Sequence, residues 1–355
     1  MAALLFEPLK LRDVTLRNRI VVSPMCEYSS EHGFANDWHL VHLGSRAVGG
    51  AGAILTEAAA VTADGRISAA DLGIYKDAHV ETLSRIFRFI EQHGAVPGMQ
   101  LAHAGRKAST AEPWKGGGPV APEDGGWTPI WAPSATPFRE GWQTPRAMTK
   151  DDIATVVAAF ATAAGRLRDA GGRIAEIHAA HGYLLHEFLS PLSNHRDDEY
   201  GGTFENRVRL LNEVVDAVRQ VWPERLPLFV RISATDWVDG GWTVEDSVAL
   251  ARGLKPRGVD LVDCSSGGNV PSAKIPLGPG YQVPLADRVR RDADIMTGAV
   301  GLITEPAQAE EILQRGQADV VIIARQFLRD PYFALHAAQS LGETPAVPIQ
   351  YQRAF

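Results

Sequence analysis

The chain has 355 residues, of which 45% are hydrophobic and 22% are charged, and its formal net charge is −7. A chain of this length can bury a full hydrophobic core. Its acidic balance argues against a nucleic-acid partner, which would require a basic face.

The first ten residues lack a basic segment followed by an apolar one, so we expect no signal peptide. No apolar run approaches the roughly 20 residues of a membrane helix, so we expect no membrane association. The two cysteines, Cys26 and Cys264, are too few for a disulfide framework and fit a reducing compartment. We therefore expect a cytoplasmic protein.

Short apolar runs rich in β-branched residues alternate along the chain with longer segments of helical period. The runs predict strands over residues 18–23, 53–61, 95–101, 173–179, 228–233, 260–265, 295–300 and 319–324. The periodic segments predict helices over residues 36–48, 78–92, 151–169, 204–221, 244–254, 284–291, 306–314 and 332–340. Thr149 to Asp152 has the pattern of a capping box at the start of the third helix.

Eight strands, each followed by a helix, predict an α/β protein with a (β/α)8 TIM barrel. The alternative is an open doubly wound sheet, which requires a glycine-rich turn after its first strand. Here that strand ends in Ser23, Pro24, Met25 and Cys26, which disfavours the alternative.

Residues 102–148, between the third strand and the third helix, form no regular pattern and contain four tryptophans and many prolines. A loop this long on a barrel is more often functional than idle. We therefore expect it to act as a lid over the catalytic face.

Barrel enzymes place their active site at the carboxyl ends of the strands. Glycine-containing backbone ends the last two strands, at Gly298 to Gly301 and at Ala324, where Arg325 follows. These positions predict a phosphate site made of backbone amides and a guanidinium group.

His178 and His181 stand with Tyr183 at the end of the fourth strand, and three interpretations are open. They could ligate a metal, which would require further ligands such as Glu176. They could be inert core histidines. They could also donate hydrogen bonds to a substrate oxygen, with Tyr183 as the proton source. Because three such residues lie within six positions, the last interpretation is favoured, and we expect no metal.

The stretch from His178 through Asn194, His195 and Arg196 to Gly202 and Arg207 resembles the signature of the Old Yellow Enzyme family. Residues 18–26, 100–106 and 298–301 are also similar to that family, so the resemblance covers nearly the whole chain. Cys26 and Tyr28 make it closest to the thermophilic-like branch, also called the xenobiotic reductase A branch. Relatives with an iron–sulfur cluster are disfavoured because two cysteines cannot hold one.

The resemblance implies a single FMN-binding domain over 1–355 and an ene-reductase that uses NADPH or NADH to reduce α,β-unsaturated carbonyl or nitro compounds. It implies catalytic roles for five residues, which are His178, His181, Tyr183, Cys26 and Tyr28. It implies FMN contacts at Pro24, Met25, Cys26, Ala58, Gln100, Arg231, Val300, Gly301, Ala324 and Arg325. Ala324 departs from the family, which often has glycine there.

Three residues are implied to shape the substrate pocket, which are Tyr28, Lys107 and Arg353. Arg353 lies in a C-terminal tail over 341–355, which in this branch reaches the active site of a neighbouring subunit. We therefore expect a homodimer or a homotetramer. Two rival functions remain: a metal-dependent barrel hydrolase using His178, His181 and Glu176, and a barrel kept as a binding protein.

Overall fold

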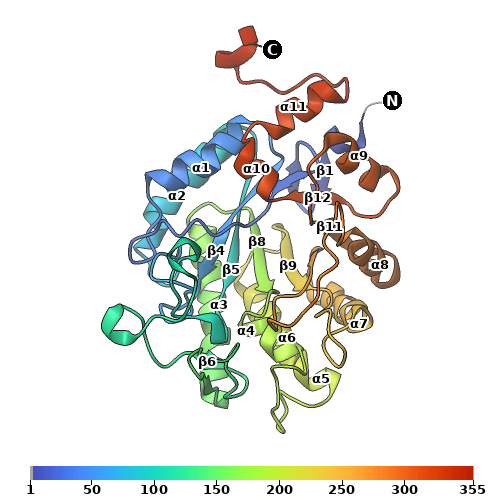
Figure 1. Ribbon diagram of the computed structural model, residues 1–355. Helices are drawn as coiled ribbons and strands as arrows, with labels where there is room; N and C mark the ends of the chain where they lie inside the picture. The colour runs from blue at the N-terminus through green and yellow to red at the C-terminus, as the bar shows by residue number, and fades with distance from the viewer. Residues whose placement is uncertain (1–2, 355) are drawn as a thin grey trace.

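A computed structural model describes residues 3–354, and its centre is a closed barrel of parallel strands (Figure 1). Within the described residues, eight strands close the barrel in the order β10-β11-β12-β3-β4-β5-β8-β9. They are β3 (Ile20–Val22), β4 (Ala53–Ala60), β5 (Val96–Ala102), β8 (Ile174–Ala179), β9 (Leu228–Ser233), β10 (Leu261–Ser265), β11 (Met296–Ala299) and β12 (Val320–Ile323). The predicted TIM barrel is confirmed.

Helices surround this barrel, and each barrel strand is followed in the sequence by at least one of them (Figure 1). The principal ones are α1 (Asp37–Val48), α2 (His79–Gln92), α3 (Lys150–Asp169), α6 (Arg209–Val221), α7 (Val244–Leu254), α8 (Val283–Ala293), α9 (Pro306–Gln314) and α11 (Phe333–Ser340). The predicted capping box of α3 is present, because the Asp152 amide donates to Thr149 Oγ1 and the Thr149 amide donates to Asp152 Oδ2.

The strands are buried on both faces, as expected for a parallel sheet that is filled inside and covered by helices outside. All residues of β8, β9, β10 and β12 are buried. Strand β4 has a register shift between Leu55 and Ala58, so Glu57 lies in an irregular stretch and Ala58 pairs with Gln100. Such irregularities re-aim side chains near active sites.

Several short elements were not predicted. An N-terminal hairpin pairs β1 (Leu9–Leu11) with β2 (Val14–Leu16). Helix α4 (Leu184–Leu189) follows β8, and α10 (Arg325–Arg329) follows β12. The helix predicted over 204–221 is two helices, because Val208 separates α5 (Phe204–Arg207) from α6.

The segment over 102–148 is irregular, as predicted, but it is packed. It contains short 3-10 helices and two strands, β6 (Trp131–Ala132) and β7 (Arg146–Ala147), which pair with each other. The indole N–H of Trp131 donates to Asp64 Oδ2 at 2.7 Å. Ala104, Ala108 and Ile130 form a small core of their own, against which Tyr183 packs. The segment therefore forms a wall beside Tyr183.

Among residues 3–354, no helix combines the length and the apolar character needed to cross a membrane.

Candidate active site

The three side chains predicted to handle substrate lie together at the carboxyl end of β8. His178 belongs to β8, while His181 and Tyr183 belong to the turn between β8 and α4. The His178 ring lies edge-on to the His181 ring at 5.2 Å and to the Tyr183 ring at 5.1 Å between centroids. Since the His178 ring contacts both of the other rings, one small molecule can reach all three.

The turn that carries these residues has an unusual backbone. His181 has φ +59° and Gly182 has φ +70°, so two consecutive residues are left-handed. A Cβ on Gly182 would lie 2.3 Å from the Gly268 carbonyl oxygen, so only glycine fits. Backbone strain of this kind persists where the surrounding structure enforces it, typically at functional sites.

Neighbouring strands fix the orientation of His181. Its amide donates to Ser233 Oγ at 2.9 Å, and its Nε2 lies 2.6 Å from Ser265 Oγ. The two serines end β9 and β10. They were not assigned a role from the sequence, although their place at the carboxyl ends of strands was a usable signal.

Burial, with a nearby positive charge at the two histidines, determines the protonation states of His178, His181 and Tyr183. Burial first, and Arg231 second, hold the pKa of both His178 and His181 well below the usual value for histidine. Burial also holds the pKa of Tyr183 well above its usual value. At neutral pH the two rings are therefore uncharged N–H donors, and Tyr183 retains its phenolic proton. The Nδ1 atom of His178 is buried without a hydrogen-bond partner in residues 3–354.

Cys26 and Tyr28 approach Tyr183 from the loop after β3. Burial, together with Asp71 and Glu57, holds the pKa of the Cys26 thiol well above its usual value, although part of the residue stays accessible. Burial followed by the nearby Cys26 also raises the pKa of Tyr28. Ala58 and Tyr183 line one small cavity with Asp71. The segments that follow β3, β4 and β8 therefore lie close together around Tyr183.

The predicted phosphate residues line a second cavity, of about 140 Å³, at the ends of β11 and β12. Val300, Gly301, Ala324 and Arg325 all contribute to it, and Arg231 reaches it from β9. Gly301 has φ +125°, and a Cβ there would lie 2.9 Å from Gln282 Nε2. Ala324 has φ −103°, so its side chain carries no left-handed strain.

Gln100 and Arg231 lie inside the barrel with buried acidic partners. Gln100 Nε2 donates to Glu176 Oε1 at 2.7 Å, and Arg231 Nε lies 3.2 Å from Asp263 Oδ2. Burial raises the pKa of Glu176 to about 8 and that of Asp263 to about 6. This set of amide and guanidinium donors, with the arginine-lined cavity, fits a ligand that has acceptors at one end and a phosphate at the other. FMN is such a ligand.

Lys107 contacts the turn between β8 and α4 that carries His181 and Tyr183. Its Nζ donates to the carbonyl oxygens of His181 and Gly268, at 2.8 and 2.5 Å. Its ammonium lies 4.3 Å from the Phe138 ring centroid, and burial lowers its pKa to about 7. Lys107 therefore braces the turn.

Arg353 is not brought to the site within one chain. It is exposed on the 3-10 helix Ile349–Ala354, which stands beyond α11 and apart from the barrel (Figure 1).

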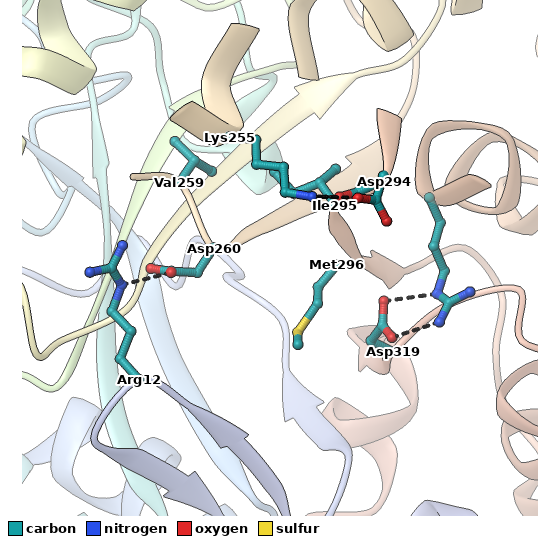
Figure 2. A pocket seen from close by; sticks show the side chains of 9 residues that line it. Arg12, Lys255, Val259, Asp260, Asp294, Ile295, Met296 and Asp319 are labelled. Atoms are coloured by element: carbon teal, nitrogen blue, oxygen red, sulfur yellow. Dashed lines mark hydrogen bonds and ion pairs between the residues drawn. The ribbon is translucent and has the colours of Figure 1, made fainter. Parts of the chain in front are cut away.

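A pocket of about 490 Å³ lies at the opposite, amino-terminal ends of β10, β11 and β12 (Figure 2). Three ion pairs line it, which are Arg12–Asp260 at 2.7 Å, Lys255–Asp294 at 2.6 Å and Arg290–Asp319 at 3.0 Å. Because each charge already has its partner, this pocket offers a ligand no free charge. Polar residues at this end of a barrel usually serve its stability.

Among residues 3–354, no group of three or more histidines, cysteines and acidic residues is arranged to hold a metal ion. The ligand set considered for a metal hydrolase is thus not assembled there. Glu176 instead accepts the hydrogen bond from Gln100.

Known proteins resemble this chain over its whole length. The "NADH:flavin oxidoreductase / NADH oxidase family" matches residues 4–343. A protein of Geobacillus sp. (strain WCH70) called NADPH dehydrogenase is 53% identical over 355 residues, with 99% of both chains covered. The solved structure of morphinone reductase has a TM-score of 0.78 at 26% identity, with 96% of this chain and 90% of that chain covered.

A second solved structure, 2-naphthoyl-CoA reductase with 2-naphthoyl-CoA, has a TM-score of 0.86 at 25% identity. It covers 98% of this chain, which spans 53% of that larger protein. Since the family match runs through the entire barrel, the chain belongs to the NADH:flavin oxidoreductase / NADH oxidase family, which confirms the predicted membership of the Old Yellow Enzyme family and makes it an oxidoreductase with FMN as its cofactor.

Proposed function

We propose that this enzyme is an ene-reductase, which uses NADPH to reduce the C=C bond of α,β-unsaturated carbonyl or nitro compounds. The observation that carries the proposal is the contact of His178 with both His181 and Tyr183 at one strand end. Two neutral N–H donors can bind one oxygen atom, and a neighbouring phenol can deliver a proton. The relatives called NADPH dehydrogenase support NADPH as the electron donor.

In this proposal the substrate oxygen binds between the imidazoles of His178 and His181, which stabilise the negative charge that develops on it. Since Ser265 already contacts His181 Nε2, the substrate competes with that hydroxyl. Tyr183 gives its proton to the α-carbon. When bound, FMN would supply the hydride for the β-carbon, and the residues of this chain would orient the substrate and polarise its oxygen.

For the cofactor, we propose that Pro24, Met25, Cys26 and Ala58 line the flavin ring. Gln100 and Arg231 would bind its pyrimidine end, and Cys26 would tune its reduction potential. Val300, Gly301, Ala324 and Arg325 would hold the phosphate, supported by the cavity that they share. The wall over 102–148 would shape the substrate pocket as a lid, together with Tyr28 and the bracing Lys107.

Arg325→Ala is expected to weaken FMN binding about 10- to 100-fold, because a hydrogen bond to a charged group contributes about 1.5–3 kcal/mol. Titration of the FMN-free protein with FMN, followed by flavin fluorescence, measures the change. Arg291→Ala, on the exposed side of α8, is the matched control and should bind FMN normally. Equal affinities for all three proteins would contradict the phosphate assignment.

The C-terminal tail is proposed to complete the substrate site of a neighbouring subunit through Arg353 in a homodimer or homotetramer. Support comes from the exposure of the tail, in which Ile349 is 76% and Tyr351 41% exposed. Truncation after residue 349 is expected to raise the KM for an enone several-fold, while Arg353→Lys should have a smaller effect. Unchanged kinetics in the truncated enzyme would refute the role.

Product analysis tests the proposed reaction itself. Anaerobic incubation with NADPH and 2-cyclohexenone is expected to give cyclohexanone, identified by mass spectrometry. The proposed reaction would be contradicted if the enzyme oxidises NADPH in the presence of oxygen but forms no saturated ketone under anaerobic conditions.

A further inference from the structure

The turn that carries His181 and Tyr183 is held by a buried histidine that the proposed reaction does not use. His186, on α4, accepts the Gly182 amide N–H at its Nδ1 atom, at 2.8 Å. Its other ring nitrogen, Nε2, lies 3.1 Å from Asp236 Oδ1. Both side chains are fully buried, with 0% of each exposed.

These contacts specify where the ring proton lies. Because Gly182 N–H is a donor, Nδ1 of His186 must present a lone pair, and the proton resides on Nε2. That nitrogen faces the carboxylate. Burial alone would raise the pKa of Asp236, but His186, Ser190 and the Trp242 amide together hold it below its usual value. Asp236 is thus the anion that selects the Nε2–H form of the ring.

We propose that Asp236 and His186 are positioning residues for the active site, in which the carboxylate fixes the His186 tautomer and the ring in turn fixes the Gly182 amide. This inference rests on the proposed function, since it assigns the pair to the turn between the oxygen-binding histidine and the proton donor. Gly182 separates His181 from Tyr183, and both it and His181 hold left-handed backbone angles. A shift at this amide therefore moves both side chains.

Asp236→Asn tests the tautomer directly. The other carboxylate oxygen, Oδ2, accepts from the Trp242 amide at 2.8 Å and from Ser190 Oγ at 2.5 Å. Because a backbone amide is always a donor, the oxygen of the introduced carboxamide is expected to stay there, which turns its NH2 group toward His186. The ring proton must then move to Nδ1, where it faces the Gly182 N–H, donor against donor. Removing the orienting carboxylate of a histidine is known to select the wrong tautomer.

The first readout is the ring ¹⁵N spectrum of the FMN-bound enzyme labelled at histidine. The His186 signals are assigned by their loss in His186→Asn. We expect Nε2–H in the wild type and Nδ1–H in Asp236→Asn. Ser190→Ala, which removes one donor to Oδ2 without changing what faces the ring, should keep the wild-type tautomer. A wild-type tautomer in Asp236→Asn overturns the inference.

The second readout is a double-mutant cycle in kcat/KM for enone reduction. Asp236→Asn is expected to lower kcat/KM about 100-fold, the scale of a small misplacement of reacting groups. In His186→Asn, the amide oxygen can accept the Gly182 N–H whatever occupies position 236. Adding Asp236→Asn to it should therefore change kcat/KM less than about threefold. An equal loss in both backgrounds would mean that Asp236 acts only on its own loop, and would overturn the inference.

A third comparison does not depend on the folding of Asp236→Asn. His186→Asn and His186→Leu both remove the partner of Asp236, but only Asn keeps an acceptor for Gly182. His186→Asn should retain at least about fivefold more kcat/KM, since an unpaired buried donor costs about 1–3 kcal/mol. Equal kcat/KM values would contradict the assignment. If instead His178 and Tyr183 variants keep full turnover, the proposed function fails while the tautomer result still stands.

Discussion

Tyr183→Phe is expected to lower the turnover of an enone by about 10²- to 10⁴-fold, the contribution of a positioned general acid. The phenol is the proposed proton donor to the α-carbon, and its raised pKa keeps the proton on it at neutral pH. The ring remains, so its packing against Ala104, Ala108 and Ile130 is retained. Reduction of the flavin by NADPH should continue at nearly the wild-type rate, because that half-reaction requires no proton from Tyr183.

Stopped-flow measurement of the two half-reactions separates these effects. Tyr200→Phe is the matched control, because its hydroxyl contacts Glu213 away from the site. It should behave as the wild type in both half-reactions. If Tyr183→Phe reoxidises with an enone at the wild-type rate, another group supplies the proton.

His178→Ala is expected to lower the turnover of an enone by about 10²- to 10³-fold, because one of two donors to the developing negative charge is lost. Weaker binding of the substrate oxygen should also raise KM. His178→Asn keeps an amide donor near the same place and should lose less. Steady-state assays under anaerobic conditions give both constants.

His93→Ala serves as the control, since this ring lies at the C-cap of α2, where it stacks on Phe89 and its Nδ1 contacts the Phe89 carbonyl. FMN content must be measured for each variant, so that a loss of cofactor is not taken for a loss of turnover. Wild-type kcat and KM in His178→Ala would remove this residue from the oxygen-binding pair.

The barrel was predictable because its signal is local. Each strand is a short apolar run, and each principal helix has its own hydrophobic period. Helices α1, α3 and α7 also begin with a capping box. Elements of a few residues, such as α4 and the β1–β2 hairpin, carry too little periodic signal to be recognised. The helix break at Val208 could not be predicted, because no proline or glycine lies there.

The sequence predicted which side chains stand together at the end of β8, but it did not predict the residues that hold them in place. His178, His181 and Tyr183 are neighbours in the sequence, so their proximity follows from the motif itself. Asp236 contacts His186 from a distant part of the chain, and Ser265 contacts His181 across 84 positions. Such pairs become visible only when the barrel closes and brings the ends of β8, β9 and β10 together.

The predicted position of Arg353 in the active site cannot be tested in a single chain. Its predicted role depends on a second copy of the chain, and a single chain leaves it exposed beyond α11.

The visible absorption spectrum of the purified enzyme, recorded anaerobically before and after NADPH and then after an enone, tests the central claim most directly. The account predicts bands of oxidised flavin that bleach with NADPH and return when 2-cyclohexenone is added. Bands that bleach with NADPH but stay bleached with enones and nitroalkenes would contradict the proposed reaction. A colourless protein that takes up no FMN would contradict the cofactor site as well.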